Sequence, residues 1–344
     1  MALMRGRGIT FDTGFLSGGT STREPFDPDV VRREMRIIRD DLRCNAVRVT
    51  GGYRERLKIA AHHAAEAGLE VWLSPFTNGL APSELLTLLA ECAEVAEELR
   101  RRSTEFVLLT GSELSLFTVG FMPGDSLEER VALLTTPQRL GPLLPDVRAR
   151  INDFLGKALE VVRERFGGKV SYASLPFEGV DWTPFDVIST DAGYRSSALA
   201  SRFRDDIRAF VAQGREHGKP VAITEFGCTT HRGAADLGGR GDSIVEWGND
   251  ARPLRLKGDF TRDEEEQAGY IQELLDVFDA EGVDTAFVNT FARYDLPHRP
   301  SPGEDFDMAS YGVVKVLERP GRRYPDMPWE PKAAFATLAS HYGS

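Results

Sequence analysis

The chain has little cysteine, no long apolar run and no excess of positive charge. Its 344 residues include three cysteines, Cys44, Cys92 and Cys228, which are widely spaced. A sparse, odd set predicts reduced thiols rather than a disulfide framework or a zinc site. No stretch approaches the roughly 20 apolar residues of a membrane span, and the first residues lack the apolar segment of a secretory signal. We therefore expect a cytoplasmic protein with no membrane partner.

Charge and composition narrow the class of protein further. The formal net charge is -11 at pH 7, from 53 acidic and 42 basic residues. Nucleic-acid binding requires a basic surface, so this balance argues against a nucleic-acid partner. Apolar residues make up 41% of the chain and charged residues 28%, which is typical of a globular protein with a sizeable core. The composition indicates nothing about the oligomeric state.

Short apolar segments alternate with helical patterns along the whole chain. Eight segments have the character of strands: residues 8–11, 46–49, 69–75, 106–110, 169–174, 185–190, 221–224 and 285–290. The spacing of apolar residues predicts helices over 28–42, 57–67, 82–102, 147–166, 198–217, 262–281 and 331–341. Eight such units without an interior break predict an α/β fold, a single (β/α)8 barrel (TIM barrel) domain over residues 1–344. An open doubly wound sheet is disfavoured, because the glycine-rich turn after the first strand lacks the dinucleotide-binding fingerprint.

Two glutamates directly follow predicted strands. Glu113 comes after the apolar segment 106–110, and Glu225 comes after the segment 221–224. The carboxyl ends of parallel strands meet at one face of a barrel, and active sites are built on that face. The two side chains are therefore predicted to form a pair of catalytic carboxylates.

The two longest connections follow these same two strands. They span residues 114–145 and 226–261, and glycine and proline interrupt both of them. Long loops in a compact domain commonly serve as lids or binding loops. We expect both insertions to lie at the active-site face and to select the substrate. The alternative interpretation is that both insertions are surface loops without a function.

The segments LLTGSELSLF and AITEFGCTT resemble those of the clan A glycoside hydrolases. The resemblance implies a (β/α)8 barrel and retaining hydrolysis or transglycosylation of a small glycoside or oligosaccharide, with no cofactor or metal. In that group an acid/base glutamate ends the fourth strand and a nucleophile ends the seventh, which implies these roles for Glu113 and Glu225. Arg48 in NAVRVTGG and Tyr194 in TDAGYR match positions that hydrogen-bond the nucleophile. Pairing of Arg48 with Asp12 is the alternative.

The sequence departs from the pattern of this group at two places. Ser112 stands where the group usually has an asparagine that binds the sugar 2-hydroxyl, a contact that strengthens in the transition state. The eighth strand often ends in a tryptophan, whereas the segment here is FVNTFARY, in which Asn289, Phe291 or Tyr294 could cover part of that role. These departures favour a second hypothesis, in which the same two glutamates serve non-glycosidic acid–base chemistry as an isomerase, cyclase or hydrolase. A catalytically silent carbohydrate-binding barrel is the third.

Several other residues fall near predicted strand ends, where they would contact a substrate or face solvent. The polar members of this set are Asp12, Asn78, Glu178, Asp191, Arg293 and Asp295. Trp182 and Trp247 occupy loops that we place on the same side, where their rings could stack on a sugar. Trp72 lies within a strand and is predicted to be core. No metal site is expected, since His62 and His63 are adjacent on a helix and do not share a face.

Overall fold

The computed structural model describes residues 3–102, 105–248 and 250–344, and eight of the described strands close into one barrel. The barrel strands are β1 (Gly6–Asp12), β4 (Ala46–Gly51), β5 (Glu70–Pro75), β6 (Phe106–Ser112), β7 (Lys169–Ser174), β8 (Ile188–Thr190), β9 (Val221–Phe226) and β12 (Thr285–Val288). Every pairing is parallel and follows chain order, and β12 pairs with β1 to close the ring. The predicted (β/α)8 barrel is confirmed.

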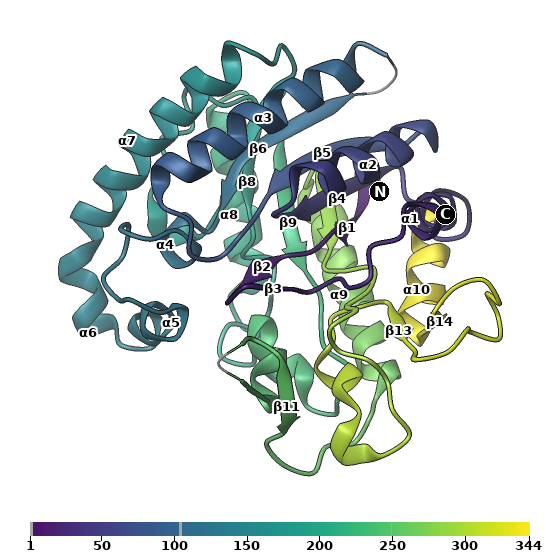
Figure 1. The fold of residues 1–344 in the computed structure, drawn as a ribbon. Helices are drawn as coiled ribbons and strands as arrows, with labels where there is room; N and C mark the ends of the chain where they lie inside the picture. The colour runs from purple at the N-terminus through teal and green to yellow at the C-terminus, as the bar shows by residue number, and fades with distance from the viewer. Residues whose placement is uncertain (1–2, 103–104, 249) are drawn as a thin grey trace.

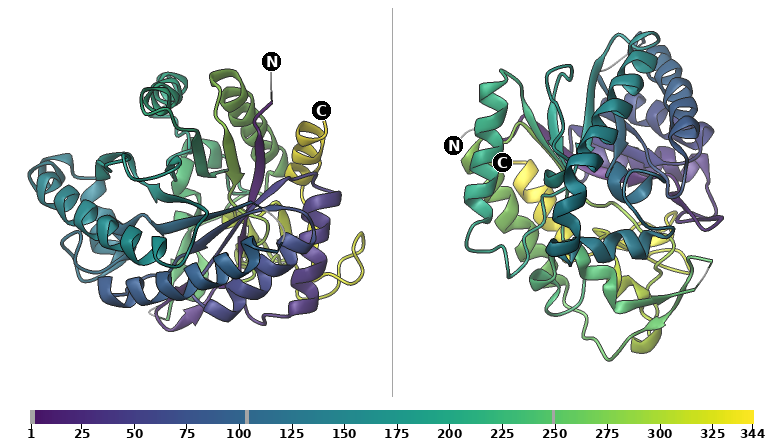
Figure 2. Two further views of the ribbon diagram at one scale, coloured as in Figure 1. Left: turned by 90° about the horizontal axis from the view of Figure 1, so that it is seen from above. Right: turned by 90° about the vertical axis from the view of Figure 1, so that its left-hand side faces the viewer.

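Helices cover the outside of the barrel (Figure 1). They are α1 (Pro28–Asp40), α2 (Arg54–Glu66), α3 (Pro82–Arg100), α7 (Leu144–Arg163), α8 (Phe203–Glu216), α9 (Glu264–Glu281) and α10 (Ala333–Tyr342). The last helix lies near the first strand (Figure 2). The Tyr342 hydroxyl on this helix donates to the Gly8 carbonyl on β1. Within the described ranges, no helix combines the length and the apolarity that crossing a bilayer requires.

The barrel interior is packed at the level of its strands. Side chains alternate along a strand between the interior and the helix-covered outside. The interior cluster consists of buried residues from six of the strands and the segment before β8: Ala46, Trp72, Val107, Leu109, Ala173, Val187, Ala222 and Phe287. The rings of Trp72 and Phe287 lie 5.1 Å apart, so the prediction of Trp72 as core is confirmed. This packed interior leaves the carboxyl ends of the strands free for polar side chains.

The two long connections contain secondary structure of their own. The first holds α4 (Leu114–Phe117), α5 (Leu127–Leu134), α6 (Pro137–Leu140) and the 3-10 turn η1 (Gly141–Leu143), which runs into α7. The second holds the 3-10 turns η3 (Ala234–Asp236) and η4 (Gly238–Ile244) and a hairpin of β10 (Val245–Trp247) and β11 (Pro253–Leu256). These elements are shorter than the window over which apolar periodicity is read, so the sequence pattern showed only loops.

Candidate active site

Arg48 lies at the centre of a polar cluster at the carboxyl end of the barrel. Its side chain is fully buried on β4, and Nη1 is 2.9 Å from Asp191 Oδ1 and 3.0 Å from Glu225 Oε1. Nη2 donates to Ser112 Oγ at 3.1 Å, and Nε donates to Ser74 Oγ at 3.2 Å. A buried guanidinium requires such partners, because desolvating an unpaired charge costs several kcal/mol. Arg48 on β4 thereby ties together side chains from the carboxyl ends of four other strands, β5, β6, β8 and β9.

Glu225 presents a carboxylate that accepts hydrogen bonds on both oxygens. Arg48 donates to Oε1, while the Tyr194 hydroxyl donates to Oε2 at 3.1 Å and Asn289 Nδ2 donates to Oε2 at 3.3 Å. Burial and the charge of Asp191 raise the pKa of Glu225 to about 7, whereas the bonds from Arg48 and Tyr194 lower it. These donors fix the orientation of the carboxylate and stabilise its ionised form.

Asp191 is the third carboxylate of the cluster. It directly follows β8, is 1% exposed, and accepts a bond from Ser112 Oγ at 2.6 Å in addition to its pair with Arg48. The single hydroxyl proton of Ser112 is therefore used within the protein, since its oxygen accepts from Arg48 and its proton goes to Asp191. Ser112 therefore helps to position Arg48 and Asp191.

Glu113 has a different environment from Glu225. It directly follows β6 with left-handed backbone angles, φ 44° and ψ 49°. A non-glycine residue in this region costs about 1–3 kcal/mol, and such residues cluster at functional sites. Burial and the charges of Asp191, Glu225 and Glu178 raise the pKa of Glu113 well above its ordinary value, with Arg48 acting in the opposite direction.

The charges of the cluster do not balance when every carboxyl group is ionised. Glu113, Asp191 and Glu225 face one guanidinium, that of Arg48. Like charges in a desolvated site oppose each other's ionisation, so one carboxyl group keeps its proton. Because Arg48 is bonded to Asp191 and Glu225, that proton belongs on Glu113. Two carboxyl groups in different protonation states can perform acid and base roles together.

Asp12 organises the loop that follows β1. Its Oδ1 accepts bonds from the backbone amides of Gly14 at 2.8 Å and Phe15 at 3.0 Å, and its Oδ2 accepts a bond from the Thr22 hydroxyl. The alternative pairing of Arg48 with Asp12 is not formed, since Arg48 Nη1 binds other carboxylates. Asp12 therefore supports the rim of the site.

Trp182 lies in the core, which corrects the prediction that it could stack on a substrate. Its side chain is 5% exposed and packs against Phe185 with ring centroids 5.4 Å apart. Lys219 Nζ, from the segment just before β9, donates to the Trp182 carbonyl. Trp182 is therefore at the amino end of the barrel, opposite the cluster. The strand spacing could not reveal this, because only the 3-10 turn η2 (Pro176–Glu178) and no α-helix intervenes between β7 and β8 in that fully described stretch.

The aromatic residues that follow β12 also differ from expectation. Phe291 is fully buried and packs edge-on against Trp329 at 5.3 Å, so it cannot form the floor of a sugar site. Tyr294 donates to Glu34 Oε1 at 2.6 Å, away from the two glutamates. Of the three residues considered for this role, Asn289 alone is bonded to Glu225.

Three further predicted residues are bonded outside the cluster. Arg293 forms a bidentate pair with Asp295 at 2.8 and 2.7 Å. Asn78 Nδ2 donates to Ser17 Oγ at 3.0 Å and joins the loops after β5 and β1. Glu178 is fully buried beneath the turn that carries Glu113 and hydrogen-bonds its backbone rather than a solvent-facing partner.

Sequence reasoning missed three residues that contact the site. Ser74 ends β5 and accepts a bond from Arg48, and the same strand-end rule would have found it. Tyr311 packs against Tyr194 with ring centroids 5.8 Å apart. Tyr172 accepts a bond from the amide of the residue after Glu113. Nothing in the sequence indicates that the Tyr172 hydroxyl makes a hydrogen bond to the site, because a tyrosine within a strand is typical of the core.

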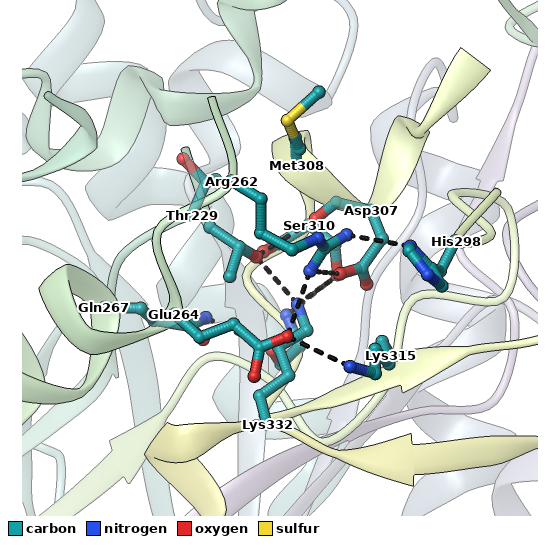
Figure 3. Close-up of polar contacts among 12 residues, drawn as sticks. Thr229, Arg262, Glu264, Gln267, His298, Asp307, Met308, Ser310, Lys315 and Lys332 are labelled. Atoms are coloured by element: carbon teal, nitrogen blue, oxygen red, sulfur yellow. Dashed lines mark hydrogen bonds and ion pairs between the residues drawn. The ribbon is translucent and has the colours of Figure 1, made fainter. Parts of the chain in front are cut away.

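A buried ion network supports the loops on the β9 and β12 side (Figure 3). Lys332 is fully buried, with Nζ 2.9 Å from Asp307 Oδ2 and 2.8 Å from Thr230 Oγ1. Arg262 Nη1 lies 2.9 Å from the same oxygen of Asp307. Since Thr230 follows β9 and Asp307 follows β12, this network holds the two loops in a fixed relation.

The solved structures to which this barrel is similar include glycoside hydrolases. A GH113 β-1,4-mannanase has a TM-score of 0.63 and 17% identity, covering 100% of both chains. The GH113 β-mannanase of Alicyclobacillus acidocaldarius has a TM-score of 0.58 and 17% identity, covering 100% of this chain and 98% of that one. The chain shares the (β/α)8 barrel fold of these two proteins.

Other glycoside hydrolase folds match as part of longer chains. The β-glucuronidase of Parabacteroides merdae has a TM-score of 0.54 and 17% identity, and the match covers 99% of this chain but 36% of that one. No family model matches the chain, and no curated protein sequence does. At these identities the likeness concerns the fold, so mechanism and substrate have to be argued from the site itself.

Proposed function

We propose that the protein is a retaining glycoside hydrolase, with Glu225 as the nucleophile and Glu113 as the acid/base. The observation that carries this proposal is the contrast between two carboxyl groups on one rim of the barrel. Glu225 accepts donors from Arg48, Tyr194 and Asn289, which stabilise an anion. Glu113 lies among carboxylates that favour its protonated form. Anion and acid are the states that the first step of double displacement requires.

In the first step, a Glu225 oxygen attacks the anomeric carbon and the glycosidic C–O bond breaks. The bonding electrons stay on the leaving oxygen, which takes the proton of Glu113 and departs as an alcohol. Esterification removes the charge of Glu225, one of the groups that raise the pKa of Glu113. Glu113 then becomes the more acidic partner and is left as a carboxylate.

In the second step, the Glu113 carboxylate removes a proton from water while the water oxygen attacks the anomeric carbon. The ester bond to Glu225 breaks, the carboxylate is regenerated, and Glu113 is again protonated. Arg48 and Tyr194 contact different oxygens of Glu225, so both stabilise the departing carboxylate. Two displacements restore the anomeric configuration of the substrate.

We propose a β-linked glycoside or a small oligosaccharide as the substrate. The mannanases and the β-glucuronidase with this fold carry β-glycosidase names, which supports that class of bond. Ser112 uses its hydroxyl on Asp191 and Arg48, so it does not replace the amide that binds the sugar 2-hydroxyl in the resembling group. We assign Asn289, whose Nδ2 donates to Oε2 of Glu225, to the region around the sugar 2-hydroxyl.

The same observation about Ser112 favours a second candidate function. Without the usual 2-hydroxyl contact, the two glutamates could transfer protons on a non-sugar metabolite, as in an isomerase or a cyclase. Asp191 adds a third buried carboxylate that a simple double displacement does not use. This candidate predicts no activity on aryl glycosides and retains Glu113 and Glu225 as acid and base.

The decisive experiment combines activity with azide rescue. Wild type, Glu113→Ala and Glu225→Ala are assayed on aryl β-mannoside, β-glucoside, β-galactoside and β-glucuronide, with exposed Glu160→Ala on α7 as the control. We expect wild-type turnover, losses of about 100-fold or more in both site variants, and no loss in the control. Azide should yield the α-glycosyl azide with Glu225→Ala and the β-glycosyl azide with Glu113→Ala. Inactivity of wild type on every sugar would favour the second candidate.

A further inference from the structure

We propose that Tyr172 and Glu178 act as a buried positioning pair that holds the acid/base Glu113 in its catalytic orientation. The inference rests on the proposed function, because it assigns a role in proton delivery by Glu113. Neither residue faces the reacting atoms, so both act through the backbone that carries Glu113.

The turn after β6 is bonded to this pair on two consecutive residues. The Leu114 amide donates to the Tyr172 hydroxyl at 2.8 Å, and the Ser115 amide donates to Glu178 Oε1 at 3.0 Å. These are amides of the first turn of α4, which have no partner inside their own helix. The pair therefore holds the peptide groups that directly follow Glu113.

The pair is also internally bonded and shielded from water. The Tyr172 hydroxyl donates to Glu178 Oε2 at 2.8 Å, and the Leu175 amide donates to the same oxygen at 2.8 Å. Both side chains are 0% exposed. Water cannot replace these bonds without opening the core, so the geometry of the turn is fixed by the fold.

The backbone of Glu113 shows why such support is needed. Its left-handed φ of 44° is unfavourable for a residue with a Cβ, and such a conformation persists only where the surroundings enforce it. The Glu113 amide is already fixed by the Ala173 carbonyl at 2.9 Å. Bonds to the next two amides complete the constraint on both sides of Glu113. Relaxation of the turn would swing the carboxyl group away from the leaving oxygen.

The charge of Glu178 gives a second reason to assign a role beyond packing. A fully buried carboxylate is rare, and Glu178 is held by two amides and a hydroxyl rather than by a cation. Only a carboxylate accepts all of these bonds, because a glutamine amide would turn its NH2 donor group towards one of these donors. Burial raises the pKa of Glu178, while the bonds from Leu175, Ser115 and Tyr172 lower it. In its ionised form Glu178 adds to the charges of Asp191 and Glu225 in favouring protonated Glu113, against Arg48.

The test uses the dependence of the rate on the leaving group. A dinitrophenyl glycoside departs without protonation, whereas a phenyl glycoside needs the acid, so only the second reports on Glu113. We expect Tyr172→Phe and Glu178→Gln to lower kcat/KM about tenfold or more on the phenyl substrate and less than about threefold on the dinitrophenyl substrate. The ratio of the two values is independent of the fraction of folded enzyme.

Tyr342→Phe is the matched control. Tyr342 is 1% exposed, and its hydroxyl makes one bond, to the Gly8 carbonyl at 3.1 Å on the first strand. The substitution removes the same hydroxyl group from an equally buried tyrosine, and we expect it to leave the substrate ratio unchanged. An equal loss on both substrates in Tyr172→Phe and Glu178→Gln, or no loss, would overturn the positioning role.

Glu113→Gln, measured in parallel, separates this inference from the proposed function. If Glu113→Gln loses activity only on the phenyl substrate while Tyr172→Phe does not, the acid/base role stands and the inference is overturned. If Glu113→Gln shows no such selectivity, the proposed function itself is wrong. The pH profile of kcat/KM gives a further test. Glu178→Gln removes a negative neighbour of Glu113 and should lower the pKa of Glu113, so the alkaline limb of the profile should move to lower pH. An unmoved limb would contradict that part of the role.

Discussion

Glu113 and Glu225 are the same residue type, and their neighbours make them different acids. Arg48, Tyr194 and Asn289 donate to Glu225, whereas Glu113 lies on a strained turn among carboxylates. The position of both glutamates after apolar strands could be predicted from the sequence. The different roles that we propose for them depend on contacts between residues that are far apart in the chain, such as Arg48 with Glu225, and local sequence patterns do not contain such contacts.

The acidic limb of the pH–rate profile should follow the ionisation of Glu225, the proposed nucleophile. Because the pKa of Glu225 is raised to about 7, kcat/KM should fall as the pH drops below about 7 and Glu225 becomes protonated. Asp191→Asn removes a like charge that raises this pKa, so the acidic limb should move to lower pH. A pH–rate profile of both proteins checks this, and a limb that stays in place or moves upward in Asp191→Asn would contradict it.

The free energy of unfolding should depend on pH because the pKa of Glu113 is raised in the folded state. A carboxyl group with a higher pKa in the folded than in the unfolded state contributes stability at low pH, and that contribution is lost as the pH rises through the folded pKa. Glu113→Gln stays neutral, so its free energy of unfolding should match wild type near pH 4 and exceed it by about 1 kcal/mol or more at pH 9. Urea unfolding at both pH values measures the difference. An advantage at pH 4 that vanishes at pH 9 would refute the assignment; exposed Glu160→Gln is the control.

At the level of helices and strands, long elements were predictable and short ones were not. The apolar runs of β6 and β9 and the periodicity of α3 extend over enough residues to be recognised. The short helices of 114–145 are set by local caps, such as the bond from the Glu129 amide to Ser126 Oγ, rather than by an apolar face. Phe185 and Val187 are buried but precede β8, so their apolar character made the predicted strand too long.

The ion network behind the site should contribute strongly to stability. Asp307→Asn leaves the fully buried Lys332 without its anionic partner, and removing one member of a buried pair costs about 3–5 kcal/mol. Asp153→Asn breaks the exposed pair with Lys157 on α7 and should cost less than about 1 kcal/mol. The free energies of unfolding in urea give the comparison. Equal costs for the two substitutions would show that the network does not bind the loops together.

At the scale of the whole molecule, closure of the barrel creates the site. β6 and β9 are separated by β7 and β8 around the ring, and only the closed ring brings Glu113 under the influence of Glu225 and Asp191. Strand order and direction could be predicted from the sequence, which is why the pair of glutamates was recognised. The path of the chain between β7 and β8 could not, and Trp182 was therefore assigned to the wrong end of the barrel.

The central claim, that Glu225 forms a covalent glycosyl ester, is tested most directly by trapping. Wild type is treated with the 2-deoxy-2-fluoroglycosyl fluoride of the sugar it cleaves best, digested, and analysed by mass spectrometry. We predict one added fluoroglycosyl group on the peptide that contains Glu225, and none in Glu225→Gln. A label on Glu113 or Asp191, or turnover with inverted configuration and no adduct, would contradict the account.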